Sequence, residues 1–127
     1  MELINILAAA VAAWVFGALW YGMLGKHWMD ATGKKPEDVD PSDKKPFVIS
    51  FVCMIIVAGM MRHIFALSGI DTIALGIMGG IGLGLFIVMP WIITHYAFAG
   101  NKAKLMLIDG GYATLGSTVM GIVLVLF

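Results

Sequence analysis

Charged residues are scarce in this chain, since aspartate, glutamate, lysine and arginine make up only 13% of its 127 residues. Soluble domains carry about 25%. The apolar share is 61% and the mean hydropathy is +0.96. This composition excludes an ordinary soluble protein and indicates an integral membrane protein. The formal net charge of zero gives no sign of a nucleic-acid partner.

Cysteine is nearly absent, because Cys53 is the only one and has no intrachain partner; disulfides are therefore not expected. The three histidines, His27, His63 and His95, are not spaced at i, i+4 and fall on different sides of the expected topology. We therefore expect no metal, haem or other cofactor. No motif for nucleophilic catalysis or dinucleotide binding is present, which argues against an enzyme.

Long apolar runs predict a single all-α domain over residues 1–127, with four transmembrane helices in an antiparallel bundle. The expected spans are residues 3–24, 46–68, 72–99 and 104–127, each long enough for a bilayer core, which needs about 20 residues. The first span follows Met-Glu without a basic n-region or a cleavage site, so we expect it to be retained. The third span contains Pro90, where loss of a backbone donor predicts a kink.

One long polar segment, residues 25–45, separates the first two spans. Its part 26–29 is expected to lie along the membrane interface. Asp40 and Pro41 resemble an N-cap and a first helical residue, so we expect the second helix to begin there. All seven lysines fall in this segment or in the turn 100–104. The positive-inside rule therefore predicts that both loops are cytoplasmic and both termini outside.

Small residues at i, i+4 spacing predict faces for close helix packing. They are Ala9, Ala13 and Gly17 in the first span, Gly76, Gly80 and Gly84 in the third, and Ala113, Ser117 and Gly121 in the fourth. We expect these ridges to pack helices within one chain and between the copies of a homo-oligomer.

Two ionisable residues, His95 and Asp109, interrupt the last two spans, each seven residues from Lys102. At 1.5 Å rise per residue they lie at similar depth, roughly 10 Å from the apex of the hairpin. A charge at that depth costs a few kcal/mol unless it is paired. We therefore predict that His95 and Asp109 are partners.

Three aromatic residues share the expected cytoplasmic half with this pair. Trp20 and Tyr21 end the first span, and Tyr112 follows Asp109 by three residues on the same helix face. Two interpretations remain open. The group is either a pocket that takes up a proton or a structural tie between the third and fourth helices.

A second polar group is expected toward the outside. Arg62 lies about two helical turns from the outer hairpin, close enough to reach Asp71 or Asn5. The alternative is a site for an anion or a lipid headgroup.

Two motifs carry a resemblance to a known family. The run FGALWYG covers residues 16–22, and LIDGGY covers residues 107–112 after Pro90 and His95. With these motifs the chain resembles an uncharacterised family of small, mostly bacterial, four-helix membrane proteins. The resemblance spans nearly the whole chain. It implies a four-helix fold and assigns no activity. We expect the protein to lie in a bacterial inner membrane.

These observations predict a structural or accessory membrane protein that contacts lipids and forms a homo-oligomer. The alternative is a small proton-coupled transporter or channel that uses His95 and Asp109. A membrane enzyme acting on a lipid-soluble substrate is the weakest hypothesis, because no nucleophile with an activating base is recognisable. A lipid or small molecule between the helices stays open as a ligand.

Overall fold

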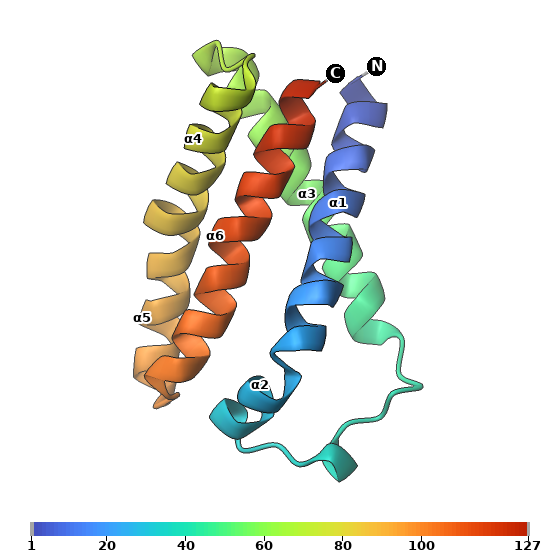
Figure 1. The fold of residues 1–127 in the computed structure, drawn as a ribbon, viewed down its shortest axis with the longest axis vertical. Coiled ribbons are helices and arrows are strands. Elements are labelled where there is room, and N and C mark those ends of the chain that lie inside the picture. The colour runs from blue at the N-terminus through green and yellow to red at the C-terminus, as the bar shows by residue number, and fades with distance from the viewer. Residues whose placement is uncertain (1, 127) are drawn as a thin grey trace.

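In the computed structural model, which describes residues 2–126, all regular secondary structure is helical, and loops and turns join the helices (Figure 1). Its elements are α1 (Glu2–Met23), α2 (Gly25–Thr32), the 3-10 turn η1 (Pro36–Asp38), α3 (Lys45–Ser68), α4 (Ile73–Leu83), the π-helical turn η2 (Gly84–Val88), α5 (Met89–Ala99) and α6 (Ala103–Leu126). No strand occurs among the described residues.

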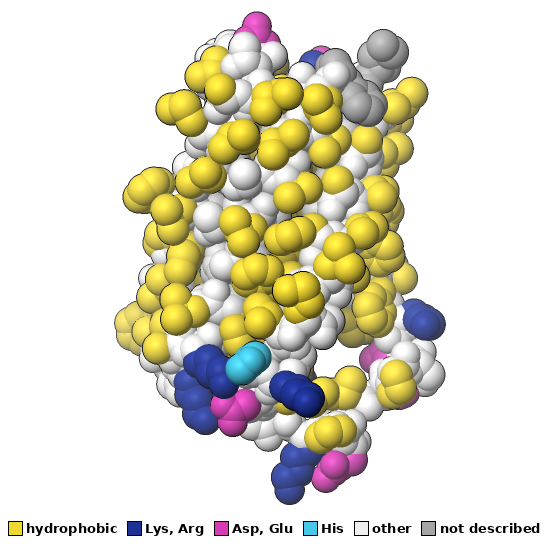
Figure 2. All heavy atoms as spheres, viewed as in Figure 1, with side chains coloured by type: hydrophobic (Ala, Val, Ile, Leu, Met, Phe, Trp, Pro, Cys, Tyr) yellow, Lys and Arg dark blue, Asp and Glu magenta, His cyan; other side chains and the backbone are white. Residues whose placement is uncertain are grey.

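Four helical segments are long and apolar enough to cross a membrane: Glu2–Met23, Lys45–Ser68, Ile73–Ala99 and Ala103–Leu126. The expectation of an all-helical chain with four such segments is confirmed. Apolar side chains cover the sides of the molecule, while charged side chains lie at its two ends (Figure 2). That distribution matches a lipid-facing surface between two polar boundaries.

Helix α6 lies at the centre of the arrangement. α4, η2 and α5 pack along one side of it, and α1 packs along the other (Figure 1). α3 packs mainly on α1, and α2 contacts α6 at the end where most of the charged residues lie. The largest buried cluster contains Ala9, Ala10, Ala13, Ala58, Met61, Phe65, Met120 and Leu124. Because α6 contacts both sides, its residues decide which side chains meet.

The glycines of the third span lie directly against α6. A Cβ on Gly80 would lie 2.5 Å from the carbonyl oxygen of Ser117, and Gly84 is equally close to the α6 backbone. Gly76 and Gly121 oppose each other in the same way. Contacts with backbone atoms are not relieved by moving a side chain, so these positions exclude larger residues. The predicted ridge of Gly76, Gly80 and Gly84 therefore packs against α6 of the same chain.

The third span is not one continuous α-helix. At η2 the amide of Met89 donates to the carbonyl of Gly84, five residues earlier, which adds one residue to that turn. The residues that follow are therefore rotated by about 100° relative to an uninterrupted helix. Pro90 comes directly after this turn, so the irregularity expected at Pro90 takes the form of a π turn.

The second span lies close to the predicted residues 46–68, but its helix begins later than the sequence predicts. α3 starts at Lys45, whereas Asp40 and Pro41 lie in the preceding loop, so the predicted helix start at Asp40 is wrong. The Asp40 carboxylate accepts hydrogen bonds from the amide and the hydroxyl of Ser42, at 2.9 and 2.6 Å. Asp and Asn side chains often hold turns in this way and compete with helix formation.

Candidate functional site

The carboxylate of Asp109 connects three helices. Its Oδ1 accepts a hydrogen bond from the hydroxyl of Tyr21 on α1, and its Oδ2 accepts one from the hydroxyl of Tyr96 on α5. Both oxygen–oxygen distances are 2.6 Å, which is typical of hydrogen bonds to an ionised group. We call Tyr21, Asp109 and Tyr96 the tyrosine–aspartate tie.

The predicted pair of His95 and Asp109 is not formed. His95 is exposed on the outward side of α5, where its ring stacks on Trp91 with centroids 5.9 Å apart. Both oxygens of Asp109 accept from tyrosines instead. Within residues 2–126 no ion pair joins the two predicted partners. The pairing hypothesis therefore names the wrong partner, and the actual partner on α5, Tyr96, is the residue directly after His95.

The π turn explains why Tyr96 takes the place of His95. Eleven residues make about three turns of an α-helix, so the inward face at Gly84 would return at His95. The extra residue in η2 moves this face on to Tyr96. Met89 marks the shifted face, since a Cβ on Gly110 of α6 would lie 2.8 Å from its Cγ. Tyr96 carries no motif of its own, and only its depth beside His95 points to it in the sequence.

Tyr112 anchors the fourth span against the first. Its ring fills the space that Gly17 leaves open, where a Cβ would lie 2.9 Å from the phenol. Its hydroxyl donates to the carbonyl of Ala13 at 3.0 Å, and its ring stacks with Phe16 at 6.2 Å between centroids. The expected packing role of Gly17 is thus specific, because the residue accommodates one aromatic ring.

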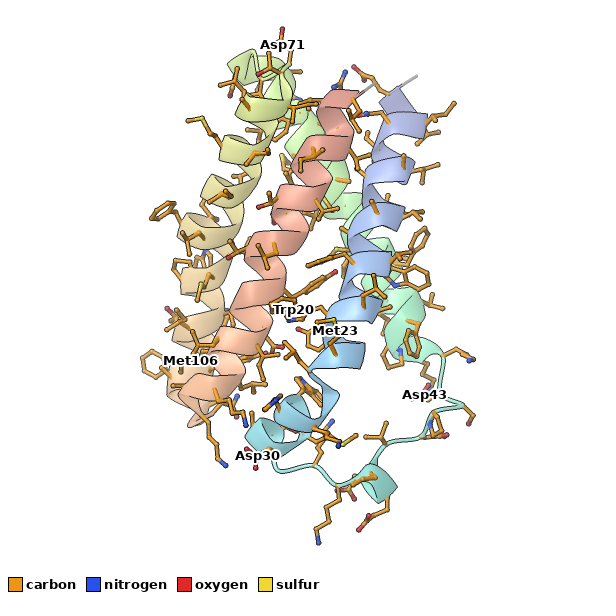
Figure 3. All side chains as sticks on the ribbon, in the orientation of Figure 1. Trp20, Met23, Asp30, Asp43, Asp71 and Met106 are labelled. Atoms are coloured by element: carbon orange, nitrogen blue, oxygen red, sulfur yellow. The ribbon has the colours of Figure 1, made fainter. Side chains whose placement is uncertain are left out.

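Trp20 makes the reciprocal contact from α1 to α6 (Figure 3). Its indole nitrogen donates to the carbonyl of Ile108 at 2.9 Å. A Cβ on Gly111 would lie 2.9 Å from its ring. The motifs FGALWYG and LIDGGY therefore dock on each other around the tie, and each small residue in the contact admits a large one from the other helix.

The outer polar group converges on the last turn of α6. The amide of Asn5 and the guanidinium of Arg62 both donate to the carbonyl of Leu124, at 3.1 and 3.3 Å. Carbonyls in a last helical turn lack intrahelical donors, and a cation near them is favourable. Asp71 is exposed at the tip of the α3–α4 connection (Figure 3). In the described part of the chain it forms no ion pair with Arg62.

Both hydrogen bonds of the tie use the carboxylate of Asp109 as their acceptor. An ionised carboxylate only accepts hydrogen bonds, whereas a protonated one carries a donor on one oxygen. A proton on Asp109 would therefore make one oxygen a weaker acceptor, and the tyrosine bonded to that oxygen would be held less strongly. No cluster of three metal-ligating side chains is found in residues 2–126.

The fold and this site define a helical protein with four membrane-length helices and a polar tie across three of them. The chain belongs to the protein family of unknown function DUF1761, which matches residues 4–125. The expected membership of an uncharacterised family is thus confirmed. Comparison with curated proteins gives no match, and comparison with solved structures gives none either.

Proposed function

We propose that the protein is a structural or accessory membrane protein that forms a homo-oligomer and has no enzymatic activity of its own. The observation that carries this proposal is the way in which the carboxylate of Asp109 is hydrogen-bonded. Both of its carboxylate oxygens accept from tyrosines of the same chain, so the polar centre joins α1, α5 and α6 instead of facing a substrate.

The outward face of α5 supports the oligomer. A shallow hollow of about 460 Å³ lies on it, lined by Phe86, Ile87, Pro90, Trp91 and Thr94. His95 is exposed beside this hollow, and acyl chains offer an imidazole no hydrogen-bond partner. A second copy packed on this face would remove the imidazole from the acyl chains. A two-fold contact along α5 would cover the same face on both copies.

A cysteine at Trp91 is expected to cross-link two copies in the membrane. The background is Cys53→Ala, and the measurement is disulfide dimer formation with an added oxidant. The matched control is Leu19→Cys on α1, because Leu19 and Trp91 are 62% and 63% exposed. Disulfides need Cα atoms within about 7 Å, so only a true contact gives rapid cross-linking. Equal cross-linking at both positions, or none at Trp91 and at its neighbour Ile87, contradicts the α5 interface.

A proton-coupled transporter is the second candidate, and the position of an ionisable carboxylate, Asp109, between three membrane-length helical segments favours it. Proton movement into proteoliposomes under a pH gradient separates the two functions. The accessory proposal predicts the same proton entry as in protein-free vesicles. The transporter predicts a faster entry that Asp109→Asn removes and His95→Ala retains, because His95 faces away from the tie.

We further propose that α2, the long loop and the α5–α6 turn face the cytoplasm of a bacterial inner membrane. The seven lysines at this end support that orientation. In the Cys53→Ala background, Lys35→Cys should be shielded from an impermeant thiol reagent in intact cells and labelled after lysis. Asp71→Cys, at the opposite end (Figure 3), should label in intact cells. The reverse pattern contradicts the orientation.

A further inference from the structure

One end of the molecule gathers basic side chains from two separate segments. α2 contributes Lys26 and His27, the α5–α6 connection contributes Lys102, and the first turn of α6 contributes Lys104. The segments meet at Asp30, whose carboxylate lies 2.8 Å from Nζ of Lys104. The hydrogen bond and charge of Lys104, then the charges of Lys102 and His27, hold the pKa of the Asp30 carboxyl below its usual value. We call the four basic residues around Asp30 the lysine surface.

The other acidic residues at this end, Glu37, Asp38, Asp40 and Asp43, lie in the long loop, and within residues 2–126 none of them forms an ion pair with these lysines. Asp38, Asp40 and Asp43 each accept a hydrogen bond from a backbone amide two or three residues away. They stabilise turns of the long loop. The three lysines of the lysine surface therefore face one carboxylate, and the surface has an excess of positive charge.

The lysine surface lies where the apolar sides of the molecule end (Figure 2). α2 packs its apolar side on α6, where Ala31 joins Leu105 and Ile108 in a buried cluster and Trp28 packs against that cluster. Lys26 and Asp30 are one turn apart on its exposed side. A half-buried tryptophan beside exposed lysines is typical of the membrane–water interface. The surface is therefore at the level of phospholipid headgroups.

We propose that the lysine surface binds the phosphate headgroups of anionic phospholipids. Lysines at headgroup level are attracted to anionic lipids, by about fivefold in affinity for each lysine. Two chain segments supply the charges, so a bound headgroup links α2 to the α5–α6 turn. Bound lipid is then expected to stabilise this end of the fold.

The test measures the thermal melting of the purified full chain in a mild detergent with three probes. Short-chain phosphatidylglycerol should raise the melting temperature to a plateau, and the titration gives an apparent Kd. Phosphatidylcholine and inorganic phosphate should have little effect. An equal effect of phosphatidylcholine would show binding without charge recognition. An equal effect of inorganic phosphate would show a site for free anions. Either result overturns the proposal.

Matched variants locate the site. Lys26→Gln with Lys102→Gln should weaken phosphatidylglycerol binding about thirtyfold. Lys44→Gln with Lys45→Gln removes the same charge from the far end of the loop and should leave the affinity nearly unchanged. Asp30→Asn removes the one carboxylate and should tighten binding. Equal losses in the two double variants, or weaker binding in Asp30→Asn, contradict a local site.

Discussion

Replacing Gly80 with leucine is expected to destabilise the protein by more than about 3 kcal/mol, at or beyond the upper end of the usual range for overpacking. The new Cβ would lie 2.5 Å from the carbonyl oxygen of Ser117 and 2.7 Å from Cα of Thr118. Both atoms belong to the α6 backbone, so α4 must move away from α6. Thermal melting and size-exclusion chromatography in detergent measure the loss.

Gly82→Leu is the matched control on the same helix. A Cβ at Gly82 meets no atom within 4 Å. Leucine also has the better helix propensity, by up to about 1 kcal/mol. This variant should therefore melt at or slightly above the temperature of the parent. If Gly80→Leu behaves like Gly82→Leu, the close packing of α4 on α6 is wrong.

Removing the carboxylate of the tie is the second change with a large expected effect. Asp109→Ala leaves the hydroxyls of Tyr21 and Tyr96 without their acceptor. Hydrogen bonds to charged groups contribute about 1.5–3 kcal/mol each in soluble proteins, but couplings inside membranes average only about 0.6 and reach about 1.7. We apply the membrane values and expect a loss of about 1–3 kcal/mol for the two bonds, measured by unfolding in detergent.

The control for this change is His95→Ala, which removes another ionisable side chain at similar depth. His95 is exposed and stacks only on Trp91 among the aromatic residues described, so its loss should cost less than about 0.5 kcal/mol. Asp109→Asn keeps one acceptor oxygen and should fall between Asp109→Ala and the parent. Equal losses at His95 and Asp109 contradict the tie.

The spans and the packing glycines were predictable because both depend on local spacing. Gly76, Gly80 and Gly84 recur every four residues, and this period places them on one helix face without reference to the rest of the fold. The two motifs were also recognisable as unusual. The packing of the two motifs on each other was not predictable. The ring of Tyr112 fills the space beside Gly17 only because α1 and α6 are neighbours, and the sequence does not show which helices are neighbours.

The partner of Asp109 was not predictable, because one π turn lies between the ridge and the polar residues. Its hydrogen bond from Met89 to Gly84 adds one residue and rotates every later side chain. The level of a residue along the hairpin depends on the count of residues, so the predicted partner, His95, is the direct neighbour of the actual one, Tyr96. The direction in which a side chain points depends on whether each preceding turn is an α or a π turn. The sequence contains no signal for a π turn that is as clear as the glycine spacing is for helix packing.

A pair of double-mutant cycles on unfolding stability tests the tie most directly. One cycle combines Tyr96→Phe with Asp109→Ala, and the other combines His95→Ala with Asp109→Ala. The structure predicts a coupling of about 0.6–1.7 kcal/mol between Tyr96 and Asp109. It predicts additive losses for His95 and Asp109. Additivity in the first cycle together with coupling in the second would place His95 on the inward face of α5 and contradict the π turn and the tie that depends on it.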